Sequence, residues 1–521
     1  MNSKPQICVA WLPDLLLANG RFEHNFAVVC DSSGQIVRLA RVEELRDEKK
    51  IRLANRAILP GMVNAHSHAF QRLLRGRTER RTISDGLPPA RSGSSPTPNA
   101  KSKDTFWTWR EMMYSAAMRL SPEDIYDASR MAFLEMALSG ITAVGEFHYL
   151  HHAPDGRPYD DPNLLAKEVI RAAGDVGLRI ALLRVAYARS GFQTAPNPKQ
   201  ARFIEAEADA YLKNLESLTR DLGYVSSPTV RAGNSRRQAL ADTRAIDTAW
   251  AGVAPHSVRA VPVDYLRQVV GYANQHSLKI HMHVAEQPAE VSASVEEHGR
   301  SPIALLETEG LLSHDFTAVH AIHVTPKSIP SFARSGAMVC ACPTTERNLG
   351  DGVVPADEYF KHAVPVCLGT DSHAQIDLLE DARELEYHLR LQKLERAVLS
   401  VSSPSVSEGD ERQEVLPDGR ASDTAALLFK CATINGACSI GAPSGALEPG
   451  KPADFFTVAL DDPAIAGVSN RYLLTSIVFA ASRVAVREVV VAGKPIVSEG
   501  QHLIQEEVVE RFNKLQARLW N

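Results

Sequence analysis

Eight short apolar segments, most of them separated by helical stretches, dominate residues 61–440 of this 521-residue chain. The segments are MVNAHSH, ITAVGEFHYLHH, RIALLRVAYA, WAGVAPHS, KIHMHVAE, TAVHAIHV, AMVCACP and VPVCLGTDSH. One of the helices between them is marked by Ser121 as its N-cap and by Gly140 just after its end. Strands that alternate with helices form parallel sheets, so the pattern predicts an α/β fold with a (β/α)8 TIM-type barrel.

The two ends of the chain have a different, strand-rich pattern with Gly and Pro at the turns. Neither end has enough strands for its own core, so we expect both to form one small β-sandwich domain. The predicted domains are residues 1–60 and 441–521 for the β-sandwich, with a final helix, and residues 61–440 for the barrel. Two insertions rich in Ser, Pro, Gly or charge, near 84–104 and 402–422, are expected to be exposed mobile loops.

Charge and cysteine content restrict the partners and the compartment. The chain has 57 Lys and Arg against 62 Asp and Glu, whereas nucleic-acid-binding proteins usually carry a basic excess. Seven sparse cysteines in mostly apolar runs indicate buried thiols of a reducing compartment. No segment reaches the ~18 uninterrupted apolar residues of a membrane span. We therefore expect a cytoplasmic protein without a nucleic-acid or membrane partner.

Histidine and carboxylate residues stand where several of the predicted strands end. His66 and His68 are two residues apart on a strand, so their side chains point to the same side and can bind one ion. His283 ends another strand and Glu286 follows it, while Asp371 follows the last strand. Each of these signals alone has an ordinary structural interpretation, such as a hydrogen-bonded histidine or a helix-capping carboxylate.

The signals are more informative together. His256 and His320 end two further segments, so five strand ends carry His, Glu or Asp at the C-terminal edge, where TIM barrels keep their active sites. Three histidines and one aspartate around an open position match a catalytic zinc site, although iron or another divalent ion is also compatible. A bound divalent ion lowers the pKa of a coordinated water toward ~7.

The order HxH, His, HxxE, His, Asp on successive strands resembles the amidohydrolase superfamily over nearly the whole chain. Within that superfamily, seven stretches are similar to the formimidoylglutamate deiminases of histidine degradation. These stretches are VNAHSHAFQR, FWTWRE, GEFHYLHH, APHSVRAV, HVAEQ, TTERNLGDG and GTDSH. The HxH pair is common to the superfamily, whereas FWTWRE and EFHYLHH are far more specific to the deiminases.

The resemblance implies a role for each matching position. The implied zinc ligands are His66, His68, His283 and Asp371. The implied catalytic residues are Glu286, which shuttles a proton, His320, which orients or polarises the water, and Asp371. The implied substrate-binding residues are Gln71, Arg110, Tyr149, His256 and Arg259. The neighbouring Trp107 and Trp109 are interpreted as packing residues outside the site.

The implied reaction is the hydrolysis of N-formimidoyl-L-glutamate to N-formyl-L-glutamate and ammonia. Hydroxide formed at the metal would attack the formimidoyl carbon while Glu286 transfers the proton. The substrate is a dicarboxylate amidine, and two carboxylates favour guanidinium groups such as Arg110 and Arg259.

Several alternatives stay open at this point. We expect one metal ion, because Lys279, the candidate for the carboxylated lysine of dinuclear relatives, lies well down its strand. An aminohydrolase acting on a purine, pyrimidine or triazine ring is the main rival, and such a substrate would need stacking and amide contacts. A metal-free structural relative is the second rival. Such a protein would have lost one or more of the metal-ligand residues. The superfamily often dimerises, so a homodimer is possible.

Overall fold

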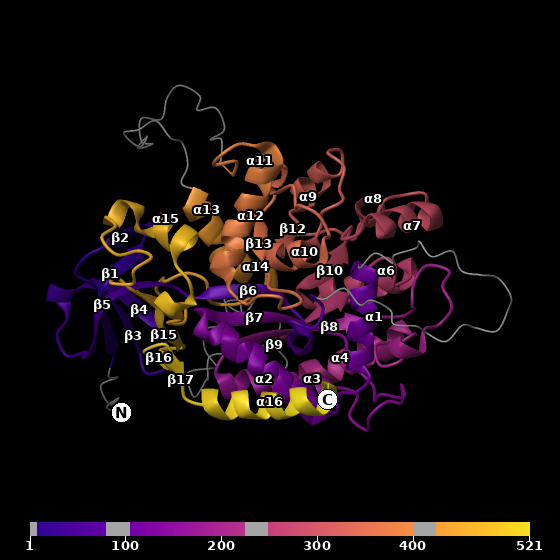
Figure 1. The fold of residues 1–521 in the computed structure, drawn as a ribbon, viewed down its shortest axis with the longest axis horizontal. Helices are drawn as coiled ribbons and strands as arrows, with labels where there is room; N and C mark the ends of the chain where they lie inside the picture. The colour runs from indigo at the N-terminus through magenta and orange to yellow at the C-terminus, as the bar shows by residue number, and fades with distance from the viewer. Residues whose placement is uncertain (1–7, 80–104, 224–247, 400–423, 521) are drawn as a thin grey trace.

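The structure of the chain is a computed structural model that describes residues 8–79, 105–223, 248–399 and 424–520 (Figure 1). The insertions predicted near 84–104 and 402–422 lie outside these residues. Within the described ranges, no helix combines the length and the apolar character needed to cross a membrane. All seven cysteines are free thiols.

Eight parallel strands form the central barrel, in the order in which they occur along the chain. They are β6 (Met62–Ser67), β7 (Ile141–His148), β8 (Arg179–Ala186), β9 (Ala249–Pro255), β10 (Ile280–Val284), β11 (Phe316–His320), β12 (Met338–Ala341) and β13 (Val366–Leu368). Each of the eight predicted segments overlaps one of them, to within one residue at the strand start for β9 and β11, and the side chains of these strands are almost entirely buried. The predicted TIM-type barrel is therefore confirmed.

The first and last strands meet where the backbone of β6 touches the segment after β13. A parallel bridge joins Ser67 to Asp371, and Asp371 N donates to His66 O over 3.0 Å. Gly369 permits this approach, because a Cβ at that position would lie 2.7 Å from His66 Cβ. The barrel is thus nearly closed, and its seam runs through two of the predicted metal ligands.

Helices cover the outside of the barrel (Figure 1). The longer ones are α1 (Phe106–Ala117), α2 (Pro122–Leu138), α3 (Leu164–Val176), α4 (Ala208–Asp221), α6 (Val263–His276), α7 (Pro288–His298), α12 (Leu378–Lys393) and α16 (Gln505–Trp520). Ser121 caps α2 by accepting a hydrogen bond from Asp124 N, as predicted. The predicted final helix is α16, which runs beside α2 along the bottom of Figure 1, where Arg130 binds Glu507 through both carboxylate oxygens.

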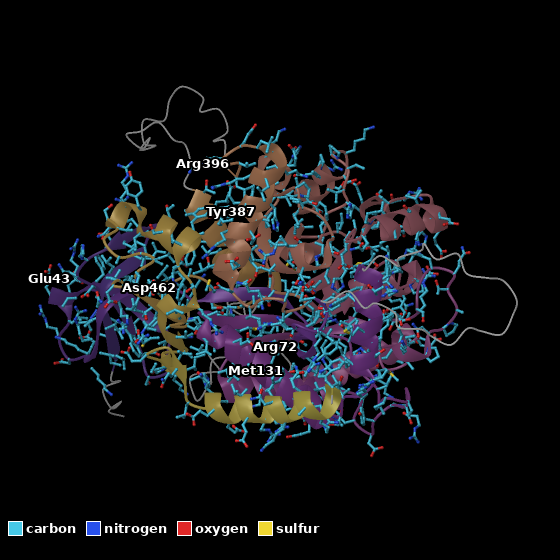
Figure 2. All side chains as sticks on the ribbon, viewed as in Figure 1. Glu43, Arg72, Met131, Tyr387, Arg396 and Asp462 are labelled. Atoms are coloured by element: carbon cyan, nitrogen blue, oxygen red, sulfur yellow. The ribbon has the colours of Figure 1, made fainter. Side chains whose placement is uncertain are left out.

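Strands from the two chain ends form a separate mixed sheet at the left of Figure 1. They are β1 (Val9–Ala18), β2 (Arg21–Glu23), β3 (Phe26–Cys30), β4 (Ile36–Arg41), β5 (Lys49–Pro60), β14 (Phe455–Ala459), β15 (Val486–Val491), β16 (Lys494–Ser498) and β17 (Gln501–His502). The two ends join where β5 pairs with β14. The nine strands are hydrogen-bonded into one sheet, and Figure 2 shows Glu43 at its outer edge. The predicted β-domain built from both termini is therefore present.

A fully buried ion pair connects this sheet to the barrel. Arg179 at the start of β8 donates from Nε and Nη2 to the two carboxylate oxygens of Asp454, which precedes β14, over 2.6 and 3.1 Å. Asp454 Oδ1 also accepts a hydrogen bond from Ala492 N. Both side chains have no exposed surface, so neither charge can be compensated by water if the other is lost.

We expect Asp454→Ala to destabilise the protein by about 3–5 kcal/mol, because it leaves the guanidinium of Arg179 buried without its carboxylate. The double variant Arg179→Met, Asp454→Leu should recover most of the loss, since it removes both charges. Calorimetric melting of the three proteins measures the effect. Equal melting temperatures for the wild type and Asp454→Ala would show that the pair does not hold the sheet to the barrel.

Candidate active site

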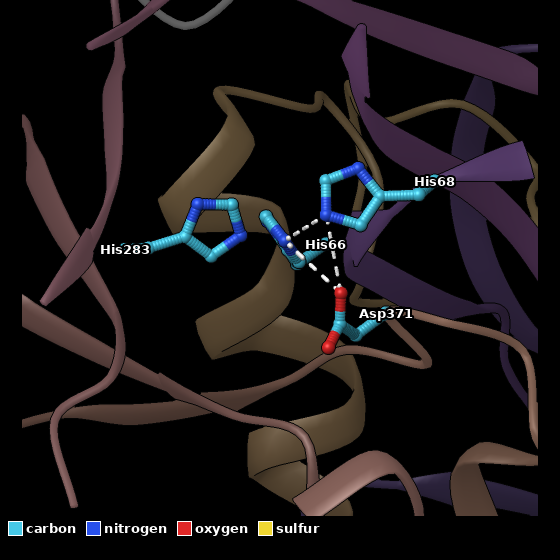
Figure 3. Close-up of side chains that lie close together, drawn as sticks. All are labelled: His66, His68, His283 and Asp371. Carbon is cyan, nitrogen blue, oxygen red and sulfur yellow. Dashed lines mark hydrogen bonds and ion pairs between the residues drawn. The ribbon is translucent and has the colours of Figure 1, made fainter. Parts of the chain in front are cut away.

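Four buried side chains converge at the C-terminal edge of the barrel strands (Figure 3). They are His66, His68, His283 and Asp371, and one ligand atom from each lies within 4.8 Å of every other. His66 Nε2 and His68 Nε2 are 3.2 Å apart, and Asp371 Oδ1 lies 3.2 Å from His68 Nε2 and 3.6 Å from His66 Nε2. The four residues predicted as metal ligands are therefore brought together.

The chemistry of these donors fits a divalent metal ion. The Nδ1 atoms of His68 and His283 lie 3.0 and 3.1 Å from the carbonyl oxygens of Phe147 and His256. A carbonyl only accepts, so each Nδ1 carries the proton and each Nε2 presents a lone pair to the common centre. Burial lowers the pKa of His66 to about 3 and that of His283 well below its ordinary value, which keeps both rings neutral.

Asp371 supplies the negative charge of the group. Burial alone would raise the pKa of this carboxyl, but the neighbouring His66 and His68 imidazoles and the charge of His320 hold it well below its ordinary value. Three imidazoles with one carboxylate match the mixed nitrogen and oxygen ligands that zinc accepts. The protein therefore has a His66, His68, His283 and Asp371 metal site.

Strained backbone marks three of the strand ends that carry the site. Ala285, which precedes Glu286, has a φ of 52°, His320 has a φ of 68° and Asp371 has a φ of 44°. Residues with a Cβ rarely adopt this left-handed region, and the cost is retained mainly where function requires a particular side-chain direction. These backbone angles indicate that the arrangement of the cluster is retained for a function, because strand packing alone does not require them.

Glu286 and His320 lie beside the metal site. His320 Nε2 is 3.6 Å from Glu286 Oε1 and 3.8 Å from Asp371 Oδ2. Burial raises the pKa of Glu286, and the charge of His320 opposes this rise. Burial also lowers the pKa of His320, but the carboxylates of Glu286, Glu346 and Asp371 together raise it to about 10.

Glu346 is a functional neighbour that the sequence did not reveal. Its Oε1 lies 3.2 Å from His320 Nδ1 and accepts a hydrogen bond from Cys342 N over 2.8 Å. Glu346 lies in the first turn of α10 (Pro343–Leu349), the helix that follows β12. In the sequence, a glutamate at this place resembles an ordinary helix-capping residue. Only the fold shows that this carboxylate orients the His320 ring.

A cavity opens beside the metal ligands, and all five predicted substrate-binding residues line it. They are Gln71, Arg110, Tyr149, His256 and Arg259. Glu286, His68, His283 and Asp371 line the same cavity, so the metal site and the predicted substrate-binding residues share one space. Gln71 Nε2 donates to the Tyr149 hydroxyl over 2.7 Å, and Gln71 Oε1 is buried without a hydrogen-bond donor among the described residues.

The sequence-based interpretation of the aromatic residues needs a correction. Trp109, which we placed outside the site, lines the cavity together with Phe106. The Trp107 ring centroid lies 4.4 Å from Arg110 Cζ, so this ring packs against one of the two arginines predicted to bind substrate. The prediction failed because α1 begins at Phe106 and turns one face of this helix toward the cavity, which the local pattern does not indicate. Tyr114, Tyr187 and Phe203 also line the cavity and were not predicted.

Arg110 and Arg259 place two guanidinium groups in this cavity. Among the described residues neither makes an ion pair with a carboxylate, although the charges of Glu286 and Glu290 act on Arg110 and Arg259 respectively. Arg110 Nε and Nη1 and Arg259 Nη1 are buried without a hydrogen-bond acceptor in that part of the chain. Burial lowers the pKa of Arg110, and the positive charge of Arg259 lowers it further. Two guanidinium groups that repel each other in a buried space favour an anionic ligand with more than one negative charge.

The structure also bears on the number of metal ions. Lys279 Nζ donates to Asp315 Oδ1 over 2.6 Å, so this lysine is used in an ion pair. A second possible ligand group, His320, Cys342 and Asp371, shares Asp371 with the first. Burial raises the pKa of the Cys342 thiol well above its ordinary value, which disfavours the thiolate that binds metals. The four-residue group is therefore the stronger site.

A His3Asp metal site at the C-terminal edge of a (β/α)8 barrel defines a metal-dependent hydrolase. Residues 57–496 match the amidohydrolase family. The chain is 35% identical over 457 residues to the formimidoylglutamate deiminase of Pseudomonas aeruginosa, and 88% of each chain is covered. The chain belongs to the amidohydrolase family, whose members include hydrolases acting on carbon–nitrogen bonds.

Two further comparisons agree with this assignment. The chain is 26% identical to the 5-methylthioadenosine/S-adenosylhomocysteine deaminase of Halobacterium salinarum over 97% of this chain and 96% of the relative. The crystal structure of an amidohydrolase from Brucella melitensis aligns with a TM-score of 0.79 and 29% identity, covering 99% of this chain and 100% of that one. Both likenesses extend over the barrel and the terminal sheet.

Proposed function

We propose that this protein is a zinc-dependent deiminase that hydrolyses N-formimidoyl-L-glutamate to N-formyl-L-glutamate and ammonia in histidine degradation. The observation that carries the proposal is the pair of buried guanidinium groups, Arg110 and Arg259, in the cavity beside the metal site. A substrate with two carboxylates and a formimidoyl group supplies both the negative charges and the carbon to be hydrolysed. The 35% identity to a formimidoylglutamate deiminase supports the same substrate.

The chain's own residues suit the steps of this hydrolysis. Zinc held by His66, His68, His283 and Asp371 would supply an activated water. Glu286 takes one proton from the attacking water and gives it to the imino nitrogen. The adduct's hydroxyl group gives up the second proton to the same nitrogen as the formyl C=O forms and the C–N bond breaks, so that ammonia leaves. Its raised pKa suits a group that both accepts and donates this proton. His320 lies next to Glu286 and Asp371 and orients the water between them.

The remaining cavity residues bind and orient the substrate. Arg110 and Arg259 pair with its carboxylates, as guanidinium groups do in buried anion sites. Gln71, Tyr149 and His256 direct the formimidoyl group toward Glu286. One zinc ion, a cytoplasmic location, a homodimer and the absence of nucleic-acid and membrane partners stay predictions of the same proposal.

The proposal is tested by measuring ammonia release from N-formimidoyl-L-glutamate, with the metal content of the same sample quantified. We expect turnover of this substrate and little or none with 5-methylthioadenosine, adenosine or an aminotriazine, because a neutral ring leaves both arginines without anions. Turnover of a ring compound alone would favour the ring aminohydrolase, for which the aromatic side chains Phe106, Trp109 and Phe203 would provide stacking surfaces. A sample without metal and without hydrolysis would favour a structural relative.

A further inference from the structure

Three buried polar side chains from separate parts of the chain meet at the cavity wall. Tyr114 belongs to α1, Tyr187 follows β8, and Gln200 ends the short 3-10 helix η3 (Pro198–Gln200). Their exposed fractions are 3%, 1% and 1%. Both tyrosines line the cavity, yet neither has a role in the proposed function.

Gln200 fixes the direction of both phenol groups. Its Nε2 donates to the Tyr114 hydroxyl over 2.8 Å and to the Tyr187 hydroxyl over 2.6 Å. Each phenol oxygen is thereby an acceptor, so its own proton is free to be donated elsewhere. A hydrogen bond between the two hydroxyls would use only one of these protons. Within the described ranges no carboxylate or carbonyl oxygen accepts either of them, so at least one proton is available to a ligand.

Each of the two rings lies next to a residue assigned to substrate binding. Arg110 Cζ is 5.5 Å from the Tyr114 ring centroid, and the Tyr187 and His256 ring centroids are 4.6 Å apart. Burial raises the pKa of Tyr114, which keeps its hydroxyl protonated and able to donate. The arginines and the tyrosines thus present charged and neutral donors side by side.

A buried dicarboxylate needs both kinds of donor. Each carboxylate has about four lone-pair sites, and a guanidinium group satisfies two of them at most. Lone pairs left without donors in a buried cavity weaken binding substantially. A further arginine would add a third positive charge to a site that already balances a dianion, whereas hydroxyl groups add donors without charge.

We propose that Tyr114 and Tyr187 donate hydrogen bonds to a carboxylate of the substrate and that Gln200 is the positioning residue that holds both hydroxyls in donating orientation. This inference rests on the proposed function, because it assigns the neutral donors for the dicarboxylate that Arg110 and Arg259 would bind. It makes the tyrosine pair a determinant of specificity for diacids.

The test compares Tyr114→Phe, Tyr187→Phe and Gln200→Glu with the wild-type holoenzyme. KM and kcat are measured with N-formimidoyl-L-glutamate, and the Kd of glutarate, a dicarboxylate that is not hydrolysed, is measured by calorimetry. Loss of a hydrogen bond to a charged group should raise KM and Kd about tenfold or more, with kcat changed less than about threefold. Gln200→Glu should have at least this effect, because its carboxylate accepts the phenol protons and turns them away from the cavity.

Tyr265→Phe is the matched control. Tyr265 is also buried, but its hydroxyl donates to Glu205 O over 3.2 Å and it does not line the cavity. We expect wild-type KM and wild-type glutarate affinity in this variant. A similar rise of KM and of the glutarate Kd in Tyr265→Phe would mean that removing any buried phenol hydroxyl disturbs the cavity. That result would contradict the inference.

The outcomes separate this inference from the proposed function. Wild-type KM and glutarate Kd in all three variants, or a fall in kcat at constant KM, would overturn the inference and leave the function intact. If the wild type does not hydrolyse formimidoylglutamate, the function is wrong, and the glutarate measurements still decide the inference. Weaker glutarate binding by Tyr187→Phe would then support a dicarboxylate site, and a wild type that does not bind glutarate would exclude it.

Discussion

Glu286→Gln is expected to lower kcat by about 10²- to 10⁴-fold, the usual contribution of a general acid–base group. Glutamine keeps the size of the side chain but can neither accept the water proton nor return it to the departing nitrogen. Glu286 is not among the four metal ligands, so the purified variant should contain as much metal as the wild type. Steady-state ammonia release and metal analysis of the same sample measure both quantities.

Glu307→Gln is the control for this prediction. Glu307 lies on α8 (Pro302–Thr308), where it pairs with Arg334 at the surface, and we expect it to be as active as the wild type. Near-normal turnover by Glu286→Gln would show that another group moves the proton. Loss of metal in that variant would show that Glu286 holds the site together instead.

Removal of one metal ligand should abolish both metal binding and activity. His283→Ala leaves two histidines and one aspartate, so we expect the metal content to fall from about one ion per chain to a small fraction of that after dialysis. Turnover should fall with it and should not return when zinc is added at concentrations that reactivate a chelated wild type. Atomic absorption and the ammonia assay follow the two quantities in parallel.

His281→Gln provides a stringent control, because His281 lies two residues earlier on the same strand and is also buried. Its Nε2 lies 3.0 Å from Ser439 Oγ and it does not belong to the four-residue group. We expect this variant to keep its metal. Equal metal loss in both variants would mean that any change within β10 disturbs the site, and the ligand assignment of His283 would lose its support.

The parts of the fold that follow from local patterns could be predicted from the sequence. The eight barrel strands are short apolar runs, and their ends carry the ligands because a parallel barrel brings all its C-terminal strand ends to one edge. His66 and His68 are found together because a strand repeats every two residues. The roles of Arg110 and Arg259 came from the resemblance to the deiminases, and the structure places both in the cavity.

Residues whose partners lie far away in the sequence could not be predicted in the same way. Glu346 meets His320 only because α10 starts beside the end of β11 in space. Tyr114, Tyr187 and Gln200 come from three segments, and no local spacing indicates that one amide donates to both phenols. Trp109 was missed because the side of α1 that faces the cavity depends on how the whole helix docks.

The seam of the barrel has a consequence for how the protein folds. Asn64 and Thr370, 306 residues apart, exchange two hydrogen bonds next to the metal site, and the ligands His66, His68 and Asp371 lie on the two sides of that contact. A metal ion bound there cross-links the first and the last strand of the ring. Such an ion would offset part of the entropy lost in closing so long a loop, so we expect metal binding to be coupled to completion of the barrel.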